Sequence, residues 1–225
     1  MNQQLIELLK RTLTGVALLV SFGGAYLHSA TLFTAALVVL LGIVLRWEWS
    51  NLVDLQKPSR LALSVLYPIM PFVVLIWLTN EFYVTDFYLP LLPFFIAWGA
   101  DTGGYVVGKL FGVHKMCPTI SPGKSWEGFA GSVLSVFAIC SYVLPKIALL
   151  SATVLTTNFF ALACFVLATT SIAFIGGLFL SVLKRKEGLK DAGSLLPGHG
   201  GILDRFDAVL FVGIFTLLLV LFVRY

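Results

Sequence analysis

Charged residues are scarce in this chain. Only 12% of its 225 residues are Asp, Glu, Lys or Arg, whereas 59% are hydrophobic. Soluble domains carry about 25% charged and about 45–50% apolar residues. The composition therefore excludes an ordinary soluble domain and predicts an integral membrane protein, with helices buried in lipid and against one another.

Cysteine is also rare. The three cysteines, Cys117, Cys140 and Cys164, lie far apart in the sequence. They fit neither a disulfide framework nor the spacing of zinc ligands, so we expect them to be packing residues.

Long apolar runs predict the membrane-spanning helices. Lys10 and Arg11 precede the first run, Leu13 to Leu27, which we expect to be an uncleaved helix with a cytoplasmic N-terminus. Further apolar runs cover residues 30–47, 61–78, 87–105, 128–144, 147–183 and 208–223. We therefore expect an all-α polytopic membrane protein with about seven crossings, and eight as the main alternative.

The run over residues 147–183 decides between these two numbers, because it is long for one span of about 20 residues and short for two. Placing the loops after the second and fourth runs and the loop after residue 183 in the cytoplasm leaves only Lys146 and Arg224 outside. This parity favours a single long or broken helix, and we expect Gly176-Gly177 to be its weak point.

Two loops carry further topological information. Residues 46–60 contain Trp47, Glu48 and Trp49, a mixture typical of an interfacial segment lying against lipid headgroups, although an ordinary connecting loop fits equally well. Residues 79–86 contain Glu81 and Asp86 but no Lys or Arg, so we expect this loop to face outward.

The richest concentration of charge lies between two apolar runs, from Ser181 to Asp207. Its charged residues include five cations and three aspartates, with a histidine beside them: Lys184, Arg185, Lys186, Lys190, Arg205, Asp191, Asp204, Asp207 and His199. Such a set suits a polyanionic substrate that arrives with a divalent metal, and neighbouring glycines such as Gly200 and Gly201 let backbone amides approach it. The alternative is a solvated positive-inside loop, which would need only Lys and Arg.

A second polar block covers residues 98–127. Asp101 lies deep in an apolar run, where an ionisable residue is a candidate for function, although a helix-terminal Asp in water is the alternative. Pro118 and Pro122 interrupt any helix over residues 106–127. Ser125 is placed to cap a helix beginning near Trp126, whose N-terminus would suit a phosphate group.

These two blocks together resemble a known family. The order Ser181-x-x-Lys184-Arg185, Lys190-Asp191-x-Gly193, Pro197-Gly198-His199-Gly200-Gly201, Asp204-Arg205-x-Asp207 resembles the signature of CDP-diacylglycerol synthases, also called phosphatidate cytidylyltransferases. The segments Asp101-Thr102-Gly103-x-Tyr105 and Ser121-Pro122-x-Lys124-Ser125-x-Glu127-Gly128 resemble the same family's other shared block. The resemblance covers residues 98–207 and implies a Mg²⁺-dependent reaction of CTP with phosphatidate to CDP-diacylglycerol and diphosphate.

Site residues follow from this resemblance together with the chemistry of the side chains. Asp204, Asp207 and Asp191 are the expected metal ligands, and Lys184, Arg185, Lys190 and Arg205 the expected phosphate-binding cations. Substrate-binding residues are expected at Lys115, Ser121, Lys124 and Ser125, and further at Asp101, Glu127, His199, Gly200 and Gly201. His199 could equally be a turn residue bonded to backbone.

The resemblance also implies the setting of the protein. We expect one membrane domain over residues 1–225, with N-terminal helices in 1–86 and the catalytic helices in 87–225. The active site should be a polar cavity facing the cytoplasm from a multi-pass protein of the cell membrane. CTP, phosphatidate and the bilayer are the expected partners; nucleic acid is not, and a homodimer stays open.

The sequence departs from the family pattern at one important position. The family usually carries Gly-Asp-Leu ahead of the signature serine, whereas this chain has Gly176-Gly177-Leu178; the other departures, at Gly104, Gly123 and Ala208, remove no carboxylate. We expect weaker Mg²⁺ binding in an active enzyme, with Asp191 or Asp101 compensating. The alternatives are an inactive relative, a CTP-dependent lipid kinase, and a transporter with Asp101 as an ion relay.

Overall fold

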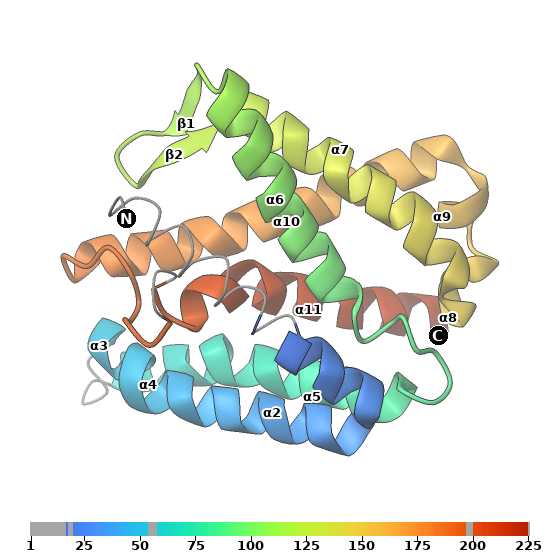
Figure 1. Ribbon diagram of the computed structural model, residues 1–225, viewed down its shortest axis with the longest axis horizontal. Helices are drawn as coiled ribbons and strands as arrows, with labels where there is room; N and C mark the ends of the chain where they lie inside the picture. Colours follow the sequence, from blue (N-terminus) through green and yellow to red (C-terminus); the bar gives the residue numbers. More distant parts are fainter. Residues whose placement is uncertain (1–16, 18–19, 54–57, 197–199, 225) are drawn as a thin grey trace, which may run out of the picture. The chain divides into compact units, whose positions relative to one another are not determined.

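The computed structural model describes residues 17, 20–53, 58–196 and 200–224, most of them helical (Figure 1). The chain forms two compact units. Unit 1 comprises Met1–Asn80 with Leu183–Phe206, and unit 2 comprises Glu81–Val182 with Asp207–Tyr225. Each unit therefore combines segments that are far apart in the sequence, and the boundaries fall inside helices. The prediction of a single domain stays a prediction.

Unit 1 is built from the N-terminal helices. Its described elements are a helix over residues 20–28, α2 (Ala30–Ile43), a π-helical segment (Val44–Trp49), α3 (Ser50–Leu52), α4 (Pro58–Ser64), a second π-helical segment (Val65–Ile69) and α5 (Met70–Phe82). The Ser29 hydroxyl caps α2 by accepting a hydrogen bond from the Leu32 amide at 3.1 Å. This is the usual way to satisfy one of the unpaired amides at a helix N-terminus.

Aromatic rings hold the core of unit 1 together. The ring of Phe33 lies 4.6 Å from that of Phe22 and 4.9 Å from that of Tyr26, in edge-to-face geometry. Phe206 brings in the C-terminal segment, because its ring stacks on Phe72 at 5.6 Å and meets Phe22 at 5.7 Å. Such pairs contribute about 0.5–1.5 kcal/mol each beyond the apolar area they bury.

The prediction that residues 46–60 lie as an interfacial segment against lipid headgroups is wrong at Glu48 and Trp49. Helical structure continues through Trp49 to Leu52, and Glu48 and Trp49 are fully buried, while Trp47 remains 54% exposed. Burial is possible because both polar groups find partners inside the unit: the Trp49 indole N–H donates to the Ser64 hydroxyl at 2.6 Å, and Glu48 accepts backbone amides described below.

Unit 2 contains the second polar block. Its elements are α6 (Leu92–Phe111), β1 (Lys115–Cys117), β2 (Ser121–Ser125), α7 (Trp126–Val143), a 3₁₀ turn (Leu144–Lys146), α8 (Ala148–Ser151), α9 (Val154–Thr157), most of α10 (Phe159–Lys186) and most of α11 (Leu203–Arg224). The two strands pair antiparallel, with Lys115 opposite Ser125 and Cys117 opposite Ser121. This ribbon, in the segment that Pro118 and Pro122 keep out of a helix, is the exception to the all-α prediction.

Helices α6 and α7 pack through small residues. A Cβ atom built on Gly103 would lie 2.5 Å from the Gly131 carbonyl oxygen, and one built on Gly131 would lie 2.6 Å from the Gly103 carbonyl oxygen. The Ser132 hydroxyl also donates to the Ala100 carbonyl at 2.7 Å. The backbones thus approach as closely as in other membrane helix pairs with small residues at the interface.

The run over residues 147–183 begins with the short helices α8 and α9 and continues from Phe159 as one long helix, α10, where one long or broken helix was expected. However, α10 continues unbroken through Gly176 and Gly177, so the predicted weak point there is wrong. A Cβ atom on Gly176 would lie 2.7 Å from the Asp207 carbonyl oxygen and 3.2 Å from the Ala208 Cα. This glycine therefore permits close packing of α11 and does not break α10.

Among the described residues, five helical segments are long and apolar enough to cross a bilayer. They are Ala30–Leu52, Arg60–Phe82, Trp126–Lys146, Phe159–Lys186 and Leu203–Arg224. Their lipid-compatible surfaces include Val39, Leu134 and Phe160, which are 59%, 70% and 76% exposed. An all-helical membrane protein is consistent with these features. The predicted seven crossings stay a prediction, and residues 13–16, 18 and 19 of the first run lie outside the described residues.

Candidate functional site

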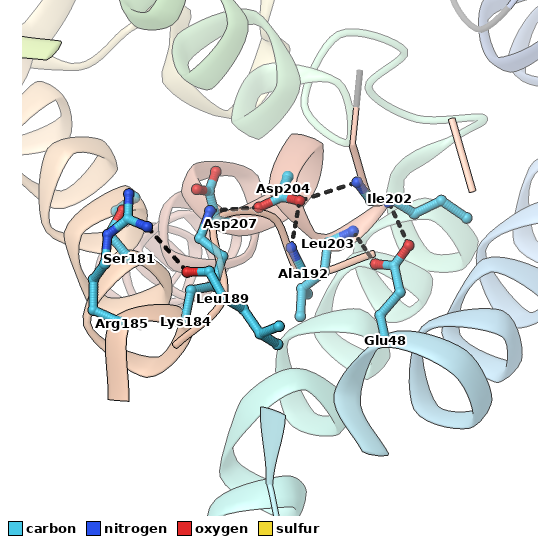
Figure 2. A network of polar contacts seen from close by, with 12 residues as sticks. Glu48, Ser181, Lys184, Arg185, Leu189, Ala192, Ile202, Leu203, Asp204 and Asp207 are labelled. Carbon is cyan, nitrogen blue, oxygen red and sulfur yellow. Dashed lines mark hydrogen bonds and ion pairs between the residues drawn. The ribbon is translucent and has the colours of Figure 1, made fainter. Parts of the chain in front are cut away.

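Asp204 is the centre of a polar cluster in unit 1 (Figure 2). Its Oδ1 accepts a hydrogen bond from the Lys184 ammonium at 2.6 Å, and its Oδ2 accepts from the amides of Ala192 at 2.8 Å and Gly201 at 3.0 Å. The side chains of Lys184 and Asp204 are only 13% and 6% exposed. The pair thus connects the last turn of α10, the loop after it and the first turn of α11.

The loop between α10 and α11 has its own hydrogen bonds. The Leu196 amide donates to the Gly200 carbonyl at 2.9 Å, and the two residues form an antiparallel bridge. Gly200 has a φ of +78°, a backbone conformation that other residues rarely adopt. Arg185 donates to the Leu189 carbonyl at 3.0 Å. The predicted site residue His199 lies outside the described residues.

Glu48 is a member of this cluster that the sequence analysis missed. Its Oε1 accepts a hydrogen bond from the Ile202 amide and its Oε2 from the Leu203 amide, both at 2.7 Å. The side chain caps the N-terminus of α11 from a position 155 residues earlier in the chain. The signal was present, because Glu48 is a carboxylate at the end of an apolar run, where an ionisable residue is by default a candidate for function. We call Glu48, Lys184, Ala192, Gly201–Leu203 and Asp204 the signature cluster.

Within the signature cluster, carboxylates of the chain accept hydrogen bonds from the backbone amides. The sequence analysis predicted that the glycines here would turn amides toward a phosphate, but the Gly201 amide donates to Asp204. The next two amides donate to Glu48. These three amides are therefore hydrogen-bonded within the chain and are not directed at a ligand.

The remaining predicted residues of unit 1 lie near the surface. Lys190, Asp191 and Arg205 are exposed. Asp191 lies beside Asp204, because a Cβ atom on Gly200 would be 3.3 Å from the Asp191 Cγ and 3.1 Å from the Asp204 Oδ2. Over the described part of the chain, no three His, Cys, Asp or Glu side chains are grouped so that they could hold a metal ion.

Unit 2 contains a pocket of about 280 Å³ between α6, β2, α7 and α10. It brings together four of the predicted substrate-binding residues. Its lining is formed by Ala100, Asp101, Gly104, Tyr105, Ser121, Gly123, Lys124, Ser125, Gly128, Phe129, Ser132, Thr170, Ala173 and Phe174. The Thr170 hydroxyl is fully buried at this wall and has no hydrogen-bond partner among the described residues. A buried polar atom of this kind usually bonds to water or a ligand.

The structure confirms the predicted helix cap at the edge of this pocket. The Ser125 hydroxyl accepts a hydrogen bond from the Gly128 amide at 3.1 Å, and α7 begins at Trp126. The cap occupies one of the amides at the helix N-terminus. The Ser125 hydroxyl is therefore already hydrogen-bonded within the chain, although Ser125 lines the pocket.

Lys124 crosses the pocket to α10. Its ammonium donates to the Phe174 carbonyl at 3.2 Å and lies 4.3 Å from the centroid of the Phe174 ring. A Cβ atom on Gly177 would be 2.8 Å from this ammonium and 3.5 Å from the Asp207 Oδ2. The position where the family usually has an aspartate thus lies beside a cation and a carboxylate of the predicted site.

Two predicted substrate-binding residues lie away from the pocket lining. Lys115 is exposed on β1. Glu127 pairs with His114, whose ring Nδ1 lies 2.6 Å from Oε1 and whose amide lies 3.2 Å from both carboxylate oxygens. The His114–Glu127 pair therefore fixes the start of the ribbon to the first turn of α7.

Comparison with known proteins gives one consistent result. The model of the cytidylyltransferase family matches residues 60–223. The phosphatidate cytidylyltransferase of Rickettsia conorii is 34% identical over 211 residues, which are 93% of this chain and 89% of that protein. The Haemophilus influenzae enzyme of the same name is 32% identical over 93% of this chain and 78% of its own length. That of Staphylococcus epidermidis is 43% identical over 122 residues, 54% of this chain and 45% of its own.

Proposed function

The chain belongs to the cytidylyltransferase family, and on this premise we propose that it transfers the cytidylyl group of CTP to phosphatidate. The products are CDP-diacylglycerol and diphosphate. The observation that carries the proposal is the extent of the similarity. The family model and the relatives that cover 93% of the chain include both polar blocks, which form the signature cluster and the pocket.

The chemistry needs charge neutralisation more than acid–base catalysis. A phosphate monoester carries between one and two negative charges at neutral pH, so the attacking oxygen needs little activation. It attacks the α-phosphorus of CTP, a new P–O bond forms, and the bond to the leaving diphosphate breaks. The obstacle is to bring two anions together in line, which requires cations fixed in position.

Both units supply such cations. Lys184 is held by Asp204, and Arg185, Lys190 and Arg205 are exposed around the same loop of unit 1, where they would bind phosphate oxygens. In unit 2, Lys124 reaches into the pocket from β2. Thr170 would offer its hydroxyl group to a substrate bound there.

Magnesium is proposed as the metal. Asp204 already accepts three hydrogen bonds, and Asp191 is exposed beside it. Asp207 lies near Lys124, the cation of the pocket in unit 2. Mg²⁺ usually takes one or two carboxylates together with substrate phosphates and water, so this donor set fits it even without a preformed protein cage. Asp191 and Asp204 in unit 1, and Asp207 in unit 2, would offer carboxylate oxygens to the ion. When bound it would stabilise negative charge on the leaving diphosphate.

The proposal is tested by following two labels. Purified protein is incubated with Mg²⁺, phosphatidate and CTP carrying ³²P at either the α or the γ position. Cytidylyl transfer moves the α label into the lipid and releases the γ label as diphosphate. A CTP-dependent lipid kinase acting on diacylglycerol would instead move the γ label into the lipid. No labelled lipid from either nucleotide, in protein that remains folded, would refute the proposal.

We also propose seven crossings, with the loop between α10 and α11, which we call the signature loop, in the cytoplasm. Two ion pairs support this topology: Arg60 lies 3.6 Å from Glu187 in unit 1, and Arg224 lies 2.9 Å from Glu81 in unit 2. The first pair joins two segments expected inside, and the second joins two expected outside. Cysteines introduced at Arg60 and Lys186 should react with a membrane-impermeant reagent only from the cytoplasmic side, and one at Glu81 only from the other. Labelling of Arg60 and Lys186 positions from opposite sides would refute this topology.

A further inference from the structure

We propose that Glu48 is a positioning residue for the reaction: it fixes the signature loop so that Asp204 and Lys184 are held ready for the substrate. The inference rests on the proposed function. Glu48 lies outside residues 60–223, the segment matched by the family model. Its part in the site becomes visible only through contacts with residues far along the chain (Figure 2).

The first argument is geometric. Glu48 is fully buried, and its two oxygens accept hydrogen bonds from two successive amides, Ile202 and Leu203, at 2.7 Å each. These amides immediately follow the Gly201 amide that binds Asp204. Two carboxylates thus hold three consecutive amides, which fixes both the position and the rotation of the first turn of α11.

The second argument concerns the glycines of the signature. A Cβ atom on Gly193 would be 2.8 Å from the Glu48 Cγ, and one on Gly201 would be 2.8 Å from its Oε1. Neither glycine has a positive φ, so backbone conformation does not explain them. The space that they leave is filled by the Glu48 side chain. The signature loop is therefore shaped around a carboxylate that comes from another part of unit 1.

The third argument is energetic. A buried carboxylate is costly unless hydrogen bonds satisfy it. Within the described part of the chain, Glu48 pairs with no cation, and its hydrogen bonds come from loop amides. A loop that moved away would leave the carboxylate buried without partners, so Glu48 favours the single loop conformation in which Asp204 is also bonded. The residue need not touch substrate to act in this way.

The test compares Glu48→Gln with Trp49→Phe, a control that removes the neighbouring buried hydrogen bond to Ser64. Glutamine keeps the size of the side chain but turns an NH₂ group toward one of the two amides. At saturating CTP and phosphatidate, well below the melting temperature, we expect kcat per folded molecule to fall at least about tenfold in Glu48→Gln, with both KM values within about threefold. Trp49→Phe should lower the melting temperature at least as much and leave kcat unchanged.

A second variant, Gly193→Ala, tests the same contact if Glu48→Gln folds poorly. Gly193→Ala should displace the carboxylate and lower kcat in the wild-type background, yet have little further effect in Glu48→Ala, because the two residues act on the same contact. The inference is overturned if folded Glu48→Gln keeps the wild-type kcat, or if Gly193→Ala costs the same in both backgrounds. Wild-type protein that makes no CDP-lipid would refute the proposed function itself, before any variant is compared.

Discussion

The signature cluster and the pocket use polar groups in opposite ways. In the signature cluster, each described carboxylate oxygen of Asp204 and Glu48 accepts at least one hydrogen bond from within the chain. In the pocket, hydroxyl and ammonium groups surround about 280 Å³ of space, and the buried Thr170 hydroxyl has no partner among the described residues. The polar groups of the cluster are thus satisfied within the chain, whereas the Thr170 hydroxyl of the pocket is left without a partner in the described part of it.

This difference suggests which substitutions should affect structure and which should affect binding. Breaking a satisfied buried pair leaves an uncompensated charge and costs stability. Changing a group that awaits a ligand costs mainly affinity or rate. The predictions that follow test this distinction, beginning with the largest expected effect.

The largest effect is expected at Asp204. Asp204→Asn turns an NH₂ group toward the Lys184 ammonium or toward two amides, so activity should fall at least about 100-fold and the free energy of unfolding by about 3 kcal/mol. In the double variant Asp204→Asn/Lys184→Met no unpaired ammonium remains, so stability should partly recover while activity does not. Turnover and thermal unfolding in detergent measure the two effects. Recovery of activity together with stability would show that the pair is only structural.

A smaller effect is expected in the pocket. Lys124→Met keeps the length of the side chain but removes the ammonium, so kcat/KM should fall about 10- to 100-fold, with the melting temperature nearly unchanged. Lys115→Met is the matched variant, because Lys115 is a cation of the same polar block that lies away from the pocket lining. Steady-state kinetics compare the two. An equal loss in Lys115→Met would show that the ribbon, and not the pocket, binds the substrate.

The third prediction concerns the carboxylate missing at residue 177. A Cβ atom there would lie 2.8 Å from the Lys124 ammonium, which is the end of a flexible side chain, so Gly177→Asp should fold. The added charge should lower the Mg²⁺ concentration for half-maximal activity about two- to tenfold, because binding of hard cations depends on ligand charge. Gly177→Asn is the control of equal size. The same metal dependence in both variants would place this position outside the metal site.

The smallest effect is expected at Asp86, a buried carboxylate without the ammonium that Asp204 has. Its Oδ2 accepts from the Leu149 amide at 2.9 Å, and its Oδ1 is buried without a partner among the described residues. Burial raises its pKa above the ordinary value of 3.8. The folded state therefore binds more protons than the unfolded state between these two pKa values, and stability from this group is lost as the pH rises through the folded pKa.

Asp86→Asn should remove this dependence. At pH 7 we expect it to raise the free energy of unfolding by about 1 kcal/mol, since no charge is then buried. The gain should shrink as the pH falls and the wild-type Asp86 carboxyl takes up a proton. Melting temperatures measured in one detergent between pH 4 and pH 8 compare the two proteins. A difference that does not change with pH would contradict the assignment.

Local features were predictable from the sequence. Ser125 caps α7 as expected, because a cap depends on residues within one turn. Residues 159–186 form one helix, as the long apolar run predicted, while the number of crossings stays a prediction. Of the substrate-binding residues predicted in 98–127, Asp101, Ser121, Lys124 and Ser125 line one pocket, whereas Lys115 and Glu127 do not.

Features that depend on distant contacts were not predictable. Nothing near Glu48 in the sequence shows that its partners are the amides of Ile202 and Leu203. Gly176 was expected to weaken α10, but the absence of a side chain there serves close packing against α11. In both cases the same local pattern fits two structures, and only the packing partner decides between them.

The close contact between α6 and α7 has a practical consequence. Their association depends on backbone atoms and small side chains in direct contact, including the Ser132 to Ala100 hydrogen bond. Such contacts do not rely on the exclusion of lipid, whose tails are as apolar as the helices themselves. The wall of the pocket should therefore keep its shape when detergent replaces the bilayer, and substrate affinities measured in micelles should apply to the protein in its membrane.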